Sequence, residues 1–92
     1  LLMARGRAEL GLKRNAEALK SFQEAVRAGY DTGEVHHRIG ALLEAGGNDR
    51  DAEPAYRRAL EREPARMDSR MALIGILTRR GDLRGAAELK VE

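Results

Sequence analysis

The chain repeats itself at an interval of 34 residues, and this repetition constrains its fold more than any other feature. Counting 34 positions back from Ala52 and Tyr56 reaches Ala18 and Phe22, so that small matches small and aromatic matches aromatic. The same interval relates Ala25 to Ala59, Val26 to Leu60, Ile39 to Leu73, Leu43 to Leu77, Gly47 to Gly81, Asn48 to Asp82, and Ala52 to Ala86. Repetition at this period indicates stacked helical units that bury their apolar stripes against one another.

One stretch within the repetition carries a recognisable motif. It reads His36-x2-Ile39-Gly40-x2-Leu43, then Ala52-x3-Tyr56, then Ala59 and Pro64. This stretch resembles the tetratricopeptide repeat, a 34-residue helix–turn–helix unit with the pattern W-x2-L-G-x2-Y, A-x3-F and P. His36 departs from the pattern, because a bulky apolar residue is usual there. The resemblance implies an all-α fold in which antiparallel helix pairs stack as a right-handed superhelix, an α-solenoid.

The 92 residues are expected to form one domain of six helices. A truncated first unit spans 1–30, a complete unit spans 33–66, and a truncated third unit spans 67–92. Two alignments of the first unit remain open. One puts Met3-Ala4 at the Leu-Gly place of the motif and needs a longer turn at 12–14, whereas a strict 34-residue step pairs Gly6 with Gly40. We prefer the first, and we interpret the chain as a piece of a longer protein.

Cap residues predict the limits of the early helices. We expect one helix over 1–10 and a second over 16–28, with Asn15 as its N-cap and Gly29 as its C-cap. The segment Asp31-Thr32-Gly33-Glu34 resembles a capping box, in which Asp31 accepts from the first turn and Glu34 reaches back. The helix that follows is expected to end near Ala45, before Gly46-Gly47.

Pro54 creates a conflict in the next helix. By analogy with Asp82 its cap should be Asn48, but Pro54 would then lie well inside the helix, at a cost of roughly 3 kcal/mol. We therefore predict a late start at Asp51, or a kink or short 3₁₀ turn over 48–52. The last two helices are expected from Met67 or Asp68 to Arg80, and over 83–91 after a stop at Gly81 and a cap at Asp82.

Small and aromatic residues at the repeat positions predict the packing. The alanines are expected where helix backbones approach closely, and Gly40 is expected to let the two helices of the middle unit touch. Phe22 and Tyr56 are expected to fill the space between successive helix pairs. On the helix from 67 to 80, two inward sets fit the spacing: Met71, Ile74 and Leu77, or Leu73, Ile76 and Leu77.

Composition excludes several classes of protein. Basic and acidic residues number 17 and 15, so the net charge of +2 gives no reason to expect nucleic-acid binding, and the arginine pairs are interleaved with acids and lack stacking aromatics. There is no cysteine, hence no disulfide and no thiolate metal site. No apolar run approaches the roughly 18–20 residues of a membrane span, no signal peptide is visible, and the compartment is undetermined. The Ala-, Arg-, Gly- and Leu-rich composition suggests a bacterial source.

The sequence offers little material for catalysis. His36 and His37 are adjacent on a helix and point in different directions, so they cannot chelate one metal ion, and we expect His36 to face the packing side and His37 the inner face. No serine or threonine is expected to converge with a histidine and an acid. Carboxylates are plentiful but are expected to pair with arginines on solvated faces. We therefore expect a protein that is not an enzyme and that has no cofactor and no metal.

What the resemblance implies for function is protein–protein interaction. In tetratricopeptide proteins the first helices of successive units line a concave groove that binds a segment of a protein or peptide partner. The places that match this groove here are Arg5, Ala8, Glu9, Glu34, His37, Ala41, Glu44, Ala45, Asp68, Met71, Gly75, Thr78 and Arg79. Small residues at Ala41 and Gly75 would leave room for a guest side chain, and Met71 would offer an adaptable apolar contact.

Two further expectations limit this interpretation. Family members that grip the acidic C-terminal tails of chaperones use Lys and Asn on one inner face and Lys and Arg on another. Here the matching places hold His37, Ala41, Asp68 and Ala72, so we expect no such clamp and a partner that is less acidic, or mixed and apolar. The rival is a structural spacer or self-association segment, because an unfinished solenoid exposes apolar ends that favour homo-oligomers.

Overall fold

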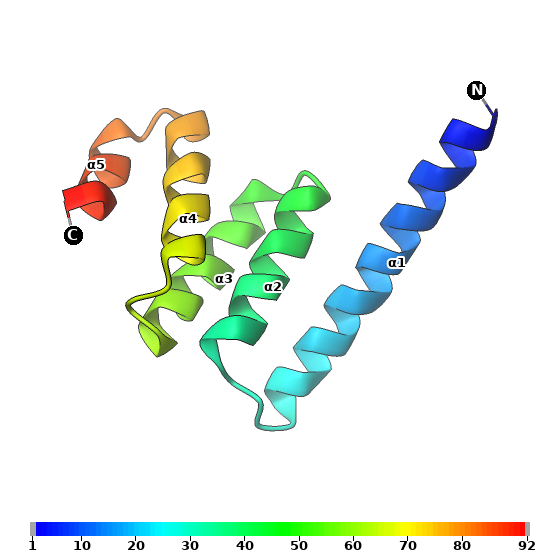
Figure 1. The fold of residues 1–92 in the computed structure, drawn as a ribbon, viewed down its shortest axis with the longest axis horizontal. Coiled ribbons are helices and arrows are strands. Elements are labelled where there is room, and N and C mark those ends of the chain that lie inside the picture. Colours follow the sequence, from blue (N-terminus) through cyan, green and yellow to red (C-terminus); the bar gives the residue numbers. More distant parts are fainter. Residues whose placement is uncertain (1, 92) are drawn as a thin grey trace.

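The computed structural model describes the backbone of residues 2–91 and the side chains of residues 14–90, and within that range its regular secondary structure is all α-helix. The helices are α1 (Leu2–Arg27), α2 (Gly33–Ala45), α3 (Asp49–Arg62), α4 (Met67–Arg80) and α5 (Leu83–Val91). Figure 1 shows them in chain order along one row, each running opposite to the one before, with the termini at opposite ends. The row measures 46 × 34 × 17 Å. The all-α expectation is thus confirmed, with five helices described instead of six.

The missing helix is explained by α1, which is a single helix of 26 residues. The turn expected at 12–14 is wrong, and Asn15 lies inside the helix and is not its N-cap. The segment Leu12-Lys13-Arg14 consists of good helix formers, and Gly11 alone costs only about 1 kcal/mol relative to alanine. Once a helix has formed, each further residue adds a hydrogen bond, so a weak turn signal does not interrupt it.

The start of α2 differs from the expected capping box. Thr32 is the N-cap, and its Oγ1 accepts a hydrogen bond of 3.2 Å from the Val35 backbone N–H. Asp31 is engaged elsewhere, with His36 and Arg62, and Glu34 pairs with Arg38 instead of reaching back. Contacts distant in the chain thus overrode a local pattern that fitted equally well.

The start of α3 also differs from the prediction. Asn48 is the N-cap and accepts a hydrogen bond of 3.2 Å from the Asp51 backbone N–H, so the helix begins at Asp49 with no 3₁₀ turn. The Asn48 amide also donates to the Asp51 carboxylate at 2.8 Å. Two hydrogen bonds at this end, with Ala52 buried in the core, outweigh the cost of carrying Pro54 inside the helix.

The other helix limits are confirmed. α2 ends at Ala45 before Gly46 and Gly47, and Gly29 has a positive φ of 107° at the end of α1. α4 ends at Arg80, its C-cap Gly81 has a left-handed φ of 87°, and the Asp82 carboxylate then accepts a hydrogen bond of 2.9 Å from the Gly85 backbone N–H. A left-handed glycine followed by a capping carboxylate lets α5 reverse direction within two residues.

The core lies between α3, α4 and α5, with α2 against α3. Tyr56 is its largest fully buried side chain, and the alanines at the repeat positions of α3 and α5 are buried as expected. Gly40 makes the α2–α3 contact, because a Cβ placed there would lie 2.8 Å from two carbon atoms of the Tyr56 ring. On α4 the buried side chains combine the two predicted sets: Leu73, Ile74, Ile76 and Leu77, with Met71 exposed.

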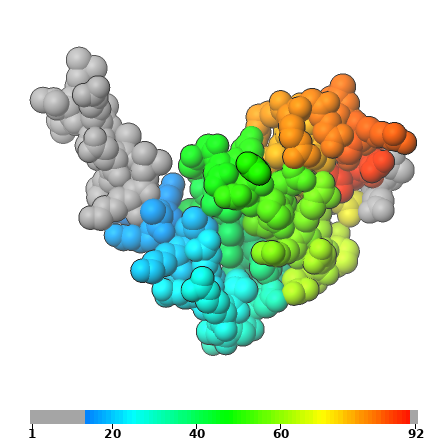
Figure 2. All heavy atoms as spheres, turned by 180° about the vertical axis from the view of Figure 1, so that it is seen from behind, coloured from blue at the N-terminus to red at the C-terminus, as the bar shows by residue number. Residues whose placement is uncertain are grey.

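α1 is attached differently from the other helices. Among the described helices only α2 has Cα atoms within 8 Å of those of α1, so the backbones of α1 and α3 flank α2 and stay apart from each other. Phe22 and the alanines Ala18 and Ala25 are consequently only half-buried, although the sequence predicted tight packing for them. Figure 2 shows the coloured part of α1 (blue to cyan) on one side, α3 (light green) on the other and α2 between them.

The 34-residue repetition extends to the crevices on the surface. One crevice of about 270 Å³ lies between α1, α2 and α3, and one of about 330 Å³ lies between α3, α4 and α5. Six of the seven residues that line the first crevice match residues of the second 34 positions later: Gln23, Val26, Arg27, His36, Ile39 and Ala55 correspond to Arg57, Leu60, Glu61, Arg70, Leu73 and Leu89. The seventh, Arg58, corresponds to position 92, which lies outside the described residues. The two crevices are therefore the same structural feature in successive units.

Candidate functional site

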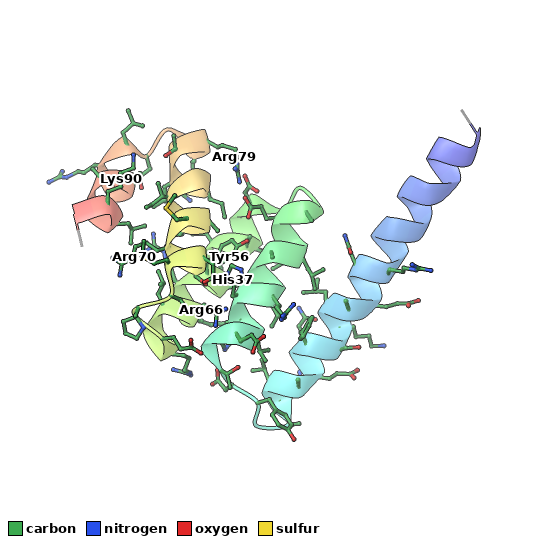
Figure 3. The ribbon with its side chains drawn as sticks, in the orientation of Figure 1. His37, Tyr56, Arg66, Arg70, Arg79 and Lys90 are labelled. Atoms are coloured by element: carbon green, nitrogen blue, oxygen red, sulfur yellow. The ribbon has the colours of Figure 1, made fainter. Side chains whose placement is uncertain are left out.

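The predicted site residues of the second and third units lie on α2 and α4. We call the surface formed by Glu34, His37, Ala41 and Glu44 of α2 with Asp68, Gly75, Thr78 and Arg79 of α4 the α2–α4 face. Figure 3 shows His37 and Tyr56 together near the middle of the molecule, with Arg79 toward one end of α4 and Arg66 toward the other. Arg5, Ala8 and Glu9, which were predicted to extend the site, lie outside the described side chains.

The first connection between α2 and α4 is made by His37. Its Nδ1 forms a hydrogen bond of 2.8 Å with Ser69 Oγ, and its Nε2 lies 3.5 Å from Asp68 Oδ2. The imidazole ring also packs against Tyr56 of α3, with 5.4 Å between ring centroids and a tilt of 49°. One side chain of α2 therefore joins three helices at this point.

The second connection is made by Glu44, whose two carboxylate oxygens have different partners. Tyr56 Oη donates to Oε1 at 2.7 Å, and Arg79 Nη2 donates to Oε2 at 2.6 Å. Arg79 Nε also donates to Asp49 Oδ2 at 3.1 Å, at the start of α3. Burial, followed by the Glu44 carboxylate, raises the pKa of Tyr56, and the carboxylates of Asp49 and Glu44 raise the pKa of Arg79. Tyr56 therefore remains a neutral donor to Glu44 near neutral pH.

Asp68 is also held within the fold. The Arg66 guanidinium donates to both of its oxygens, from Nε at 3.1 Å and from Nη2 at 3.0 Å, and the Ser69 backbone N–H donates at 2.7 Å. These donors lower the pKa of Asp68, with the Arg66 hydrogen bond as the main cause. Its charge is thus already matched before any partner arrives.

The remaining predicted residues divide into polar groups that are engaged and small or apolar groups that are open. Glu34 pairs with Arg38, and Thr78 Oγ1 donates to the Ile74 carbonyl at 2.7 Å. Ala41 and Ala45 are exposed, and a Cβ built on Gly75 would have no atom closer than 3.7 Å. Met71 is 62% exposed, but it lines a crevice with Leu89 and Lys90 of α5, away from α2.

One expectation about catalysis is wrong. Ser69, His37 and Asp68 do converge, in the order hydroxyl, imidazole, carboxylate. The Ser69 side chain is fully buried, however, so no substrate carbonyl can approach its oxygen, and Asp68 is committed to Arg66. A nucleophilic serine must present its oxygen to a substrate, so this cluster is structural. The sequence contained one signal for it, because Ser69 is a polar residue 34 positions after the apolar Val35.

His36 packs inward as predicted and is only 4% exposed. Its Nε2 lies 2.5 Å from Asp31 Oδ1, and Arg62 of α3 donates to both oxygens of the same carboxylate, at 3.1 and 2.7 Å. Arg62, followed by His36, lowers the pKa of Asp31 to about 2. Sequence reasoning missed this cluster, because Asp31 and Arg62 are far apart in the chain and either could have been a solvated surface charge.

Two further searches concern the described part of the chain only. No described helix is long and apolar enough to cross a membrane. Within the same residues, no group of three or more histidines or carboxylates is placed to hold a metal ion.

Comparison with known protein families supports the resemblance of the repeats. A family model described as tetratricopeptide repeat matches residues 1–49 and again residues 37–89. Searches of curated proteins and of solved structures found no significant match. Repeats of this family generally mediate protein–protein interaction, and proteins built from them are typically non-enzymatic scaffolds. The matched residues cover nearly the whole chain, and the chain therefore belongs to the tetratricopeptide repeat family.

Proposed function

We propose that the α2–α4 face binds a segment of a partner protein. The observation that carries the proposal is the pair of connections between α2 and α4, His37 to Ser69 and Glu44 to Arg79. They hold the two helices at a set spacing, so a partner does not need to order them on binding. A surface organised in advance loses less conformational entropy and binds more tightly for the same contacts.

The chemistry of this face indicates what kind of segment it would take. Its ionic groups are largely matched internally, so an incoming charge would have to displace an existing pair. The uncommitted positions are Ala41 and Gly75, which are small and leave room above the helix backbones. A segment with small and apolar side chains, extended or helical, fits this surface better than an acidic tail does.

A second candidate function is self-association at the α4–α5 end. Met67, Met71 and Leu83 are each more than 60% exposed there, and Met67 and Met71 line one crevice with Ile74 and Leu89. An exposed apolar cluster of this kind favours association between chains. Solution mass measured against concentration tests it, and a Met71→Glu variant that abolishes a concentration-dependent dimer would support it.

The experiment for the α2–α4 face selects peptide binders from a displayed library and then compares chain variants. Ala41→Glu places a charge in the middle of the face and replaces no residue of either connection, and we expect it to weaken selected binders about tenfold or more. Arg84→Glu is the matched control, because Arg84 is 93% exposed on α5. Binders that tolerate Ala41→Glu and lose affinity only through changes on other surfaces would refute the proposal.

A further inference from the structure

A second surface, separate from the α2–α4 face, has the shape and charge of a binding site. It is the crevice between α1, α2 and α3, which we call the Arg27–Arg58 crevice. Val26 and Arg27 of α1 form one wall, Ala55 and Arg58 of α3 form the other, and α2 forms the base. The crevice is open because α1 and α3 both pack on α2 while their backbones stay more than 8 Å apart, Cα to Cα.

The two arginines at this crevice are unlike most others in the described part of the chain. Arg38, Arg57, Arg62, Arg66, Arg79 and Arg80 each form an ion pair with a carboxylate. Arg27 and Arg58 are exposed, come from different helices, and form no ion pair with any described residue. The nearby Asp31 carboxylate does not pair with either arginine, because it forms its ion pair with Arg62. The crevice therefore carries two guanidinium groups that have no described carboxylate within ion-pair distance.

The equivalent crevice in the next unit is lined by different charges. At the place of Arg27 it has Glu61, at the place of Gln23 it has Arg57, which pairs with Glu53, and at the place of His36 it has Arg70, which is also engaged within the fold. The apolar parts correspond, since Ile39 matches Leu73. The repeat architecture thus explains the apolar crevice, but it does not explain two unpaired arginines on opposite walls of one of them.

The size and lining of the crevice indicate the ligand. About 270 Å³ is just below the range of small-molecule pockets, and it suits a side chain or two of a polypeptide. Val26, Ile39 and Ala55 offer apolar contact, and the two guanidinium groups offer planar pairs of donors that match a carboxylate. An acidic residue beside an apolar one presents both features.

We propose that the Arg27–Arg58 crevice is a second protein-binding site, which recognises an aspartate or glutamate side chain next to an apolar residue in an extended segment of a partner. The carboxylate lies between Arg27 and Arg58, and the apolar side chain packs on Ile39 and Val26. This site shares no residue with the α2–α4 face, so the two surfaces can be occupied independently. A partner that is apolar at one surface and acidic at the other could therefore occupy both.

The test is a nuclear magnetic resonance titration of the isotope-labelled full chain. The probe is an acetylated and amidated peptide with a Leu-Glu-Leu centre between Gly and Ser residues, and its counterpart has Leu-Gln-Leu. We expect the first peptide to shift the backbone amides of residues 22–27, 36–39 and 55–58, and the Arg27 and Arg58 side-chain Nε–H signals. Each of Arg27→Gln and Arg58→Gln should weaken its binding about three- to tenfold, and higher salt should weaken it further.

The matched control is Arg57→Gln, which removes one positive charge at the equivalent crevice and should leave the affinity within about twofold of the parent chain. Thermal unfolding of each variant shows whether the fold is intact, since Arg27 also complements the dipole at the end of α1. Equal binding of the Leu-Gln-Leu peptide, amide shifts confined to other surfaces, or equal losses from Arg57→Gln would each overturn the proposal. Two further results would overturn it. One is a Leu-Gln-Leu peptide that binds only when its C-terminal carboxylate is left free. The other is complete displacement of the Leu-Glu-Leu peptide by inorganic phosphate.

Discussion

Gly40 allows a sharp test of how the middle unit is packed, because two effects of opposite sign compete there. Replacing a glycine inside a helix by alanine normally raises stability by about 1 kcal/mol. At Gly40, however, the new Cβ would lie 2.8 Å from two carbon atoms of the Tyr56 ring. Tyr56 is 1% exposed and its hydroxyl is held by Glu44, so the ring has no open direction in which to move.

The sizes of these two effects decide whether Gly40→Ala raises or lowers the free energy of unfolding. Inserting a methyl group into a tightly packed core typically costs about 1–3 kcal/mol. Setting about 2 kcal/mol of overpacking against about 1 kcal/mol of helix propensity leaves a net loss of about 1 kcal/mol for Gly40→Ala. In a domain of this size that loss lowers the melting temperature by about 4–8 °C.

Gly75 is the matched control for this experiment. It also lies inside a helix, but a Cβ there meets nothing closer than the Arg79 guanidinium at 3.7 Å. Gly75→Ala should therefore raise the free energy of unfolding by up to about 1 kcal/mol, so the two variants should differ by about 2 kcal/mol. Urea unfolding followed by circular dichroism measures both. If Gly40→Ala stabilises the chain as much as Gly75→Ala does, the account of the α2–α3 contact is wrong.

Two further predictions concern α3 and Asp31. Pro54→Ala supplies a backbone donor for the Arg50 carbonyl and should raise the free energy of unfolding by about 1–3 kcal/mol in urea; unchanged or lower stability would show that α3 does not carry the cost of its proline. The folded pKa of Asp31 is about 2, below its ordinary 3.8, so its ionised form contributes stability that is present above about pH 4 and is lost as the pH falls toward 2. The loss of stability on acidification through this window should be smaller in Asp31→Asn than in the parent chain, and identical pH profiles would contradict it.

The sequence predicted those elements whose limits are set by one strong local signal. Gly81 and Asp82 end one helix and begin the next because a left-handed glycine and a capping carboxylate act within a few residues of themselves. The α2–α3 contact was predictable for a similar reason, since the motif places Gly40 and Tyr56 at fixed positions. Repetition at 34 residues then extended these local signals to the whole row of helices.

The predictions failed where two local signals of similar strength competed and a distant contact decided between them. Asp31 could have capped α2, but Arg62 and His36 hold its carboxylate, and Thr32 caps the helix instead. Ser69 could have been a surface hydroxyl, but the stacking of α4 on α2 brings it to His37. The sequence shows that such polar residues are present, but which of them pair with each other follows only from how the units stack.

The α2–α4 face shows the same division. Its residues on α2 and α4 followed from the motif, whereas their mutual engagement did not. Glu44 and Arg79 were both expected as partner-binding groups, yet they bind each other and so connect the two helices. A surface charge at a family's binding position can serve the scaffold itself, and only the geometry of the neighbouring unit reveals which role it has.

The attachment of α1 through α2 alone has a mechanical consequence. α1 and α3 are each packed against α2, and no Cα atom of one lies within 8 Å of a Cα atom of the other. A ligand that binds both Arg27 of α1 and Arg58 of α3 would link these two helices directly and would restrict the angle between them. Occupation of the crevice would then decide how rigidly α1 is held relative to α3. α2 and α4 need no ligand for this, because the Glu44–Arg79 pair already links them.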